Sequence, residues 1–490
     1  MNRFLATVLV VLSSAVVLVL EVTVTRLAAP YAGDTLETYT AAIGVALAAI
    51  ALGSKLGGDA ADRLPPARLL GPLLILGGGL TMLARPVVLV LGPPLTGAGP
   101  ITALVLVTAS IAVPAALLSA VTPVVIKTQL ADLDQTGSIV GRISAWGTVG
   151  ALAGTFLTGY VLIAALPVSA VLLVTGGALV LAGALFLLRH GLPRGRRATA
   201  AMAAVPLLGA GLLVGTPSPC DAETAYYCAR VAPDPERPTG RVLFLDDLRH
   251  GYVDTADPAH LEFAYTQWFG AAIDTLAADR PLETLHVGGG AFTMPGWLAE
   301  TRPGSTSEVL EVDPAVTDLA RAELGLRTGP ALTVREGDAR IGITEAATDG
   351  YDVVVGDAFG GLSVPWHLAT AEFTAEIDRA LRDDGLYVVN VIDRGPRDFL
   401  AAEVATIATV FDEVAVVADR GGFDDEVGGN HVIVAAHRPL DTGALRAAVA
   451  DLAEPGEVAD PERVAAWTER GRVLTDDHAP VDQLLTPYLT

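Results

Sequence analysis

Long apolar segments in the first 216 residues constrain the fold more than any other feature. About seven of them are long enough to cross a bilayer as helices, which takes roughly 20 apolar residues each. The chain is 51% hydrophobic with a mean hydropathy of +0.49, too apolar for an ordinary soluble protein of 490 residues. We therefore predict an all-α transmembrane bundle over residues 1–216. Its expected spans are 4–28, 38–58, 67–84, 101–123, 141–165, 167–188 and 198–215.

Basic residues in the short loops predict how this bundle is oriented. Arg3, Arg63, Lys127 and Arg189 all fall on one side of the membrane if the N-terminus is cytoplasmic, as the positive-inside rule requires. The first segment is too long for a cleaved signal peptide. An odd number of spans then places everything after Gly215 outside the cytoplasm. Glycines such as Gly150, Gly154 and Gly159 are expected to allow close helix packing rather than transport.

Acidic residues concentrate after the apolar half. With 32 Lys and Arg against 55 Asp and Glu, the formal net charge is −23, which argues against a nucleic-acid partner. The 2 cysteines are too few for a disulfide scaffold or a cysteine-rich zinc site, and no metal site is expected. Cys220 and Cys228 either form a disulfide, which would suit an oxidising compartment, or remain two unpaired thiols.

The acidic half predicts a linker followed by a second domain. Residues 217–240 are rich in proline and polar residues, and we predict a linker there, with the domain covering 241–490. Arg241–Leu245 and Gly251–Asp254 predict a small β hairpin with Asp246–His250 in its turn. Strands then alternate with helices, which is typical of a doubly wound α/β sheet. The expected strands are Thr284–Val287, Glu308–Val312, Leu332–Arg335, Tyr351–Val355, Leu386–Val391, Glu413–Val417 and His431–Ala435. The expected helices are His260–Ala277, Pro295–Thr301, one starting at Pro314, Ala371–Leu381 and Asp398–Val410.

Glycines and acids follow these strands where a ligand would bind. In doubly wound sheets, ligands bind at the carboxyl ends of the strands. Gly288, Gly289 and Gly290 follow the first strand, and Glu311 ends the second at Rossmann-like spacing, where a carboxylate can bind ribose hydroxyls.

Two further acids follow the next two strands. Asp338 follows the third, and Asp357 follows the fourth, where a carboxylate could accept a proton. The alternative for each acid is a turn or helix-cap residue, which we prefer for Asp313. Tyr265 and Trp268 are expected to be core residues.

These motifs resemble the spermidine synthase family of polyamine aminopropyltransferases, and more narrowly its membrane-bound bacterial members with an N-terminal multi-span domain. The matching stretches are HVGGG, LEVDPAV, EGDAR, VVVGDAFG, DDGLYVVN, LFLDDLRHGYVD and LTDDHAPVDQLL. The resemblance covers most of residues 240–440. It implies a methyltransferase-type Rossmann fold behind a small β hairpin.

The resemblance also implies an activity and roles for residues. Decarboxylated S-adenosylmethionine would be the aminopropyl donor and co-substrate, and an amine the acceptor, with no covalently bound cofactor. Glu311 would hold the ribose, Asp338 and Ala339 the adenine, and Asp357 would accept the proton. The loop FGGLSVPWH after Asp357 could close over the crevice, so Pro365 joins the expected ligand-binding set.

Three departures from the family pattern affect the groups expected to bind cationic amines. Ala291 replaces an Asp after the glycines, and Gly360 replaces an Asp after Asp357. A Tyr-His-Glu run reads Tyr265, Thr266, Gln267 here. An unpaired ammonium in a closed site is costly, so each loss should weaken amine binding.

The sequence alone leaves several functions open. The first is an aminopropyltransferase or a close transferase relative, including an S-adenosylmethionine-dependent methyltransferase, since fold alone does not decide the reaction. The second is a non-catalytic domain that binds a nucleoside or polyamine and is coupled to the membrane helices. The third is a purely structural use of the fold. Besides the lipid bilayer, a homodimer remains an option for the assembly.

Overall fold

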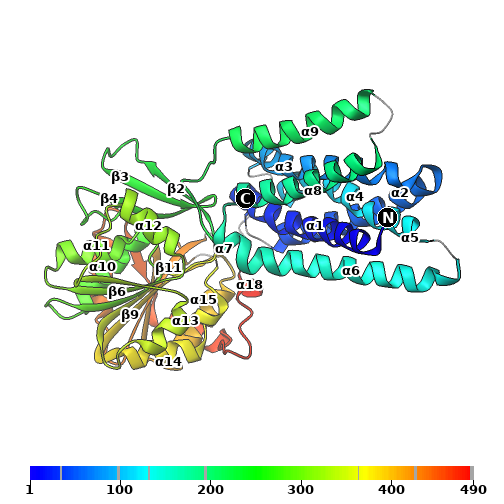
Figure 1. The fold of residues 1–490 in the computed structure, drawn as a ribbon. Coiled ribbons are helices and arrows are strands. Elements are labelled where there is room, and N and C mark those ends of the chain that lie inside the picture. Colours follow the sequence, from blue (N-terminus) through cyan, green and yellow to red (C-terminus); the bar gives the residue numbers. More distant parts are fainter. Residues whose placement is uncertain are drawn as a thin grey trace. The chain divides into compact units, whose positions relative to one another are not determined.

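The computed structural model describes residues 1–33, 36–96, 100–130, 133–191, 196–361, 363–423 and 428–485. The end of the expected second domain, 486–490, lies outside these ranges. Contacts divide the described residues into two compact units, which meet in the sequence between Cys228 and Ala229 (Figure 1). Each unit has its own core.

The first unit is helical. Its helices are α1 (Arg3–Ala32), α2 (Leu36–Arg63), α3 (Leu70–Leu95), α4 (Pro100–Ser119), α5 (Val121–Gln129), α6 (Thr136–Leu157), α7 (Ile163–Ala165), α8 (Val168–His190) and α9 (Arg196–Gly215). Within the described part of the chain, seven helical stretches are long and apolar enough to cross a membrane. They are Arg3–Ala32, Thr38–Arg63, Pro66–Leu95, Ile101–Gln129, Thr136–Ala165, Val168–His190 and Arg197–Gly215, close to the expected spans.

Two of the three expected packing glycines lie where helices touch. A Cβ on Gly150 would lie 2.4 Å from the carbonyl oxygen of Val11, and one on Gly154 would lie 2.4 Å from that of Ala15. Any larger residue would therefore push α6 away from α1. Gly159 differs, because a Cβ there would meet no atom within 4 Å among the described residues.

The segment expected as a linker contains secondary structure. Strand β1 (Ala222–Glu223) is followed by β2 (Cys228–Pro233), and Cys220 forms a disulfide with Cys228. Arg26 of α1 donates to the backbone carbonyls of Thr224 and Tyr226 inside the loop that this disulfide closes. The loop is thereby attached to the helical unit.

The second unit is built on an eight-stranded mixed sheet in the order β12-β10-β11-β9-β8-β5-β6-β7. Strands β5 to β9 run parallel, while β11 is antiparallel to both β9 and β10. The strands are β5 (Glu283–Val287), β6 (Thr306–Glu311), β7 (Leu332–Glu336), β8 (Tyr351–Gly356), β9 (Leu381–Asp393), β10 (Glu413–Asp419), β11 (Gly429–Ala436) and β12 (Gly456–Val458).

Helices cover both faces of this sheet (Figure 1). Alternate strand residues point to opposite faces: on β8, Val354 packs into one core, and Val353 and Val355 into the other. The helices are α10 (Ala264–Leu276), α11 (Thr293–Thr301), α12 (Pro314–Glu323), α13 (Ala339–Gly342), α14 (Ala371–Ala380), α15 (Asp398–Ile407), α16 (Thr442–Ala450), α17 (Pro461–Arg470) and α18 (Val481–Leu484). The alternation of strands and helices is as expected.

The small hairpin differs from its expected form. Strand β3 (Gly240–Leu245) pairs with β4 (Leu248–Asp254), and both belong to a four-stranded sheet in the order β1-β2-β3-β4. The expected five-residue turn was wrong, because only Asp246 and Asp247 connect the strands. Asp246 has φ 55, a left-handed conformation that Asp tolerates better than most residues, so the turn closes in two residues.

Two other expectations are corrected. Strand β9 begins earlier than the expected strand Leu386–Val391: residues 381–385 already belong to it, and its register with β8 shifts between Tyr351 and Val353, so the extra residues form an irregularity within one strand. Strand β12 was not expected. It has three residues, too few for a periodic pattern, and it forms only by pairing with β10.

Candidate active site

The glycine turn begins directly after β5 and requires glycine at its first position. Gly288 has φ +95, and a Cβ there would lie 2.7 Å from the carbonyl oxygen of Asp357 and 3.0 Å from the Cα of Ala358. An L side chain would therefore be strained and would collide with backbone. The ends of β5 and β8 approach each other closely because residue 288 has no side chain.

Glu311, the last residue of β6, holds this turn in place. One carboxylate oxygen accepts the N–H groups of Gly289 (2.8 Å) and Gly290 (3.2 Å), and the other accepts the N–H of Asp313 (2.9 Å). Burial raises the pKa of Glu311, while these three hydrogen bonds oppose the rise. The carboxylate thus organises the loop where the sequence predicts a nucleoside.

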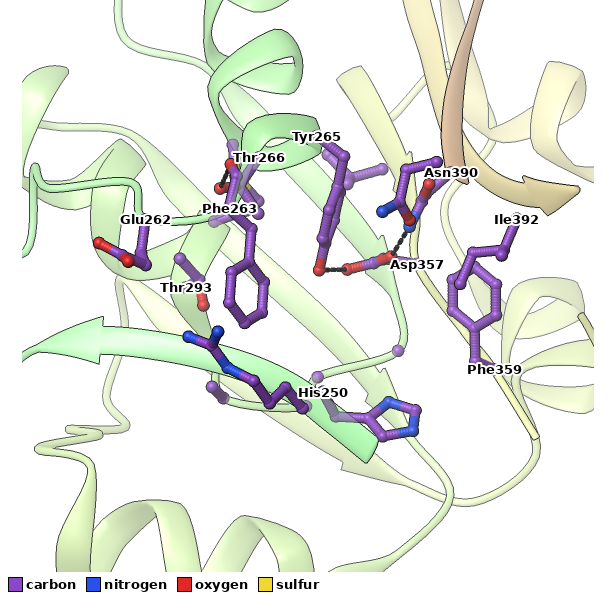
Figure 2. A pocket seen from close by; sticks show the side chains of 18 of the residues that line it. His250, Glu262, Phe263, Tyr265, Thr266, Thr293, Asp357, Phe359, Asn390 and Ile392 are labelled. Carbon is purple, nitrogen blue, oxygen red and sulfur yellow. Dashed lines mark hydrogen bonds between the residues drawn. The ribbon is translucent and has the colours of Figure 1, made fainter. Parts of the chain in front are cut away.

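Asp357 is held by one side-chain hydrogen bond on each of its carboxylate oxygens. Tyr265 of α10 donates its hydroxyl to one oxygen (3.0 Å), and Asn390 of β9 donates its side-chain N–H to the other (3.1 Å), as Figure 2 shows. Burial raises the pKa of Asp357 to about 6, although both hydrogen bonds act to lower it. The carboxylate is therefore mostly ionised at neutral pH, yet basic enough to accept a proton.

Asn390 has a further unused group. Its side chain is 2% exposed, and its Oδ1 has no hydrogen-bond partner among the described residues. Buried polar atoms are rarely left unpaired in folded proteins. The amide can therefore accept a hydrogen bond from a ligand beside Asp357.

These residues line one cavity of about 450 Å³. Gly288, Gly289 and Gly290 form part of its wall, with Asp357, Tyr265 and Asn390. In Figure 2, Glu262 and Phe263 lie on one side of Asp357, and Phe359 and Ile392 on the other. A cavity of this size suits a small organic ligand.

The charged groups lining the cavity are mostly acidic. Asp357, Glu262 and Glu454 contribute three carboxylates, against the single guanidinium of Arg249. His250 also lines the cavity, and burial lowers its pKa to about 4, so it is neutral at physiological pH. This balance favours a cationic ligand.

Four of the residues expected to bind ligand lie outside the cavity wall: Glu311, Asp338, Ala339 and Pro365. Asp338 caps α13, accepting the N–H of Arg340 (2.8 Å), and one of its oxygens lies 3.4 Å from Nε2 of His367. Pro365 immediately precedes the short helical turn Trp366–Leu368. Glu311 ends β6 and is hydrogen-bonded to the glycine turn, Asp338 and Ala339 follow β7, and Pro365 follows β8 in the chain.

Two of the three departures from the family pattern, at Ala291 and at Thr266 and Gln267, have structural counterparts. Ala291 is buried, and a Cβ on Gly251 of β4 would lie 2.5 Å from its Cβ, so the hairpin backbone occupies the adjoining space. Thr266 donates its hydroxyl to the carbonyl of Phe263. Gln267 donates to the carbonyl of Leu261 and accepts the backbone N–H of Glu454. The two polar replacements in α10 are thus used to fix backbone.

Sequence reasoning missed part of the site. Tyr265 was expected to be a core residue, and it is buried, but its hydroxyl also binds Asp357 across 92 residues of sequence. Asn390 was quoted only as part of a strand motif. A polar residue inside an apolar strand run, VVNVI, is the local signal that marks it.

Known proteins similar to this chain point to one family. The chain is 30% identical over 217 residues to a polyamine aminopropyltransferase of Vibrio vulnificus, covering 42% of this chain and 70% of that protein. It is 29% identical over 136 residues to a probable polyamine aminopropyl transferase of Bifidobacterium longum, covering 27% of this chain and 30% of that protein. Among solved structures, a probable spermidine synthase from Corynebacterium glutamicum matches with 25% identity and a TM-score of 0.48, over 53% of this chain and 95% of that one.

No protein-family model matches the chain. The similarity to the Vibrio protein, at 30% identity over more than two thirds of its length, is sufficient by itself. The chain belongs to the polyamine aminopropyltransferase family.

Proposed function

We propose that this protein transfers an aminopropyl group from decarboxylated S-adenosylmethionine to an amine, with Asp357 as the proton acceptor. The observation that carries the proposal is the half-buried Asp357, held by Tyr265 and Asn390 in a cavity whose wall includes the glycine turn. The acidic lining supports it, because both substrates are cations.

The reaction needs little from the protein beyond positioning and proton removal. The nitrogen lone pair of the acceptor attacks the propyl carbon next to the sulfonium, and the carbon–sulfur bond breaks. Its electron pair stays on sulfur, which leaves as neutral 5′-methylthioadenosine. The proton lost by the acceptor nitrogen passes to the carboxylate of Asp357. Holding both reactants in line supplies most of the remaining rate.

The donor would bind on the glycine-turn side of Asp357. In this proposal Gly288, Gly289 and Gly290 contact the nucleoside, and Glu311 accepts the ribose hydroxyls. Asp338 and Ala339 contact the adenine, and Pro365 borders the ligand. The position of these residues after neighbouring parallel strands supports the assignment.

A non-catalytic nucleoside- or polyamine-binding domain is the second candidate. The replacements at Ala291 and Gly360 favour it, because they remove acids that the family resemblance expects near the amine. Its discriminating property is ligand binding without turnover.

Binding calorimetry on the purified full chain in detergent tests the proposal. We expect decarboxylated S-adenosylmethionine to bind more tightly than S-adenosylmethionine, because the acidic cavity disfavours a ligand carboxylate. Asp338→Ala should weaken that binding. Preference for the carboxylated form would reassign the protein as a methyltransferase, and no binding of either at millimolar concentration would refute the enzyme proposal.

The membrane location is also proposed. We place the helical unit in the bilayer as a multi-pass domain, with the C-terminal unit on the extracytoplasmic side. The Cys220–Cys228 disulfide supports this sidedness. In a variant with both cysteines replaced by Ser, a cysteine introduced at exposed Glu469 should react with a membrane-impermeant maleimide in intact cells. Labelling only after lysis would reverse the sidedness.

A further inference from the structure

The order of strands divides the cavity into two sides. Apart from Pro365, the residues proposed to bind the donor lie at the ends of β5, β6 and β7, and Asp357 follows β8. On the other side of β8, the sheet continues as β9, β11, β10 and β12. An acceptor that attacks in line, opposite the departing sulfur, must therefore approach from the β9 and β11 side.

Glu454 contributes an acid on this acceptor side. It lies just before β12 and lines the same cavity as Asp357, together with Asn430 of β11. Its backbone is fixed by α10: Gln267 accepts its N–H (3.1 Å), and the indole N–H of Trp268 donates to its carbonyl (3.2 Å). The side chain is exposed and has no ion-pair partner among the described residues. A charged group is thus held on rigid backbone at the cavity.

A second observation points to a ligand at this end. The Oδ1 of Asn390 is buried, lies on β9 and has no hydrogen-bond partner among the residues described. An acceptor nitrogen between Asp357 and β11 would supply the missing donor. Further along, Asp419 of β10 pairs with Gly456, two residues after Glu454, and the pKa of Asp419 is raised by burial and by the negative charge of Glu454. The acceptor side is therefore negative as well as incompletely hydrogen-bonded.

We propose that Glu454 binds the distal ammonium of an extended diamine or polyamine acceptor, and that it determines which acceptor is used. The reacting nitrogen would lie at Asp357 and Asn390, and the distal nitrogen at Glu454. The inference rests on the proposed function for its account of which ligand occupies each side. Glu454 acts as a specificity residue and takes no part in the bond-making step.

Amine binding to the purified full chain tests this directly. Calorimetry with 5′-methylthioadenosine present fills the donor side, so that amine binding reports on the acceptor side alone. The probes are a ladder of α,ω-diamines, from propane-1,3-diamine to octane-1,8-diamine, and the monoamines of matching length. The variants are Glu454→Gln, Glu454→Asp and, as a matched control, Glu462→Gln, which removes an exposed acid in the first turn of α17.

We expect Glu454→Gln to raise the Kd of the best diamine about tenfold, the scale of one lost charge-assisted hydrogen bond. Monoamine binding should not change, because monoamines have no distal ammonium. Glu454→Asp should shift the preference to a longer diamine, since its carboxylate is one methylene shorter, and Glu462→Gln should match the wild type. Unchanged diamine binding in Glu454→Gln, an equal loss for monoamines, or no diamine binding by the wild type would overturn the proposal.

A transfer assay on the same variants, with decarboxylated S-adenosylmethionine in place of 5′-methylthioadenosine, separates this inference from the proposed function. If diamines bind in a Glu454-dependent way but no aminopropyl transfer occurs, the enzyme proposal fails and the acceptor-side site stands. If transfer occurs and is indifferent to Glu454, the inference fails and the proposed function stands.

Discussion

Removing the Tyr265 hydroxyl should raise the pKa of Asp357, so that the carboxylate is a stronger base but is ionised only at higher pH. Each oxygen of Asp357 accepts one hydrogen bond, from Tyr265 at 3.0 Å and from Asn390 at 3.1 Å, and the residue is half-buried. Tyr265→Phe keeps the ring but leaves one oxygen without that donor. A hydrogen bond to a charged group is worth about 1.5–3 kcal/mol, and 1.36 kcal/mol corresponds to a tenfold change in ionisation.

The assay is the pH dependence of kcat/KM for the donor, which reports groups of the free enzyme. Asp357 must be ionised to accept a proton, so activity in the wild type should rise with pH through about 6, the pKa to which burial raises this carboxyl. In Tyr265→Phe the rise should move to about pH 7 or above, by the same energies. Activity should recover at high pH.

The matched control is Tyr351→Phe. Tyr351 is also a buried tyrosine that donates to a carboxylate, Glu308, at 2.8 Å, and it lies at the opposite end of β8 from Asp357. Its variant should keep the wild-type profile. An unmoved acid limb in Tyr265→Phe, or an equal shift in the control, would refute the assignment of the limb to Asp357.

Three further perturbations test the site. Gly288→Ala should lower the free energy of unfolding by about 1–3 kcal/mol in thermal or denaturant melts, because φ is +95 and the new Cβ would lie 2.7 Å from a backbone atom. The control is Gly296→Ala, where a Cβ meets no described atom within 4 Å, and it should not destabilise the protein. Asp357→Asn should have a higher free energy of unfolding than the wild type at pH 8, by up to about 3 kcal/mol. The reason is that the wild-type carboxyl, with a pKa of about 6, stabilises the fold fully below about pH 4 and loses that contribution as pH rises through 6. A difference that does not shrink toward pH 5 would contradict this. Glu311→Gln should weaken donor binding about tenfold or more, because the two carboxylate oxygens of Glu311 accept three backbone N–H groups and an amide offers only one acceptor oxygen. Unchanged affinity in calorimetry would count against Glu311 as a nucleoside ligand.

Local patterns in the sequence predicted most of the framework. Apolar runs of spanning length marked the helical unit, and strands alternating with helices marked the sheet. The glycine turn was also readable, because Gly288, Gly289 and Gly290 directly follow a short apolar strand. These features depend on residues that are close together in the chain.

The rest of the site depends on contacts between distant residues. Tyr265 reaches Asp357 over 92 residues, and Gln267 binds the backbone of Glu454 over 187. Periodicity indicates which face of α10 is buried but not which buried residue meets a carboxylate. Strand β12 was not predicted for the same reason, because its three residues form a strand only by pairing with β10. Glu454 enters the cavity through these long-range contacts.

Product analysis of a single reaction tests the central claim most directly. The purified full chain is incubated with decarboxylated S-adenosylmethionine and butane-1,4-diamine, and the products are measured by mass spectrometry. We expect equal amounts of 5′-methylthioadenosine and aminopropylated diamine from the wild type, and neither from Asp357→Asn, although that variant still binds the donor. No aminopropylated product from the wild type, or undiminished product from Asp357→Asn, would contradict the account.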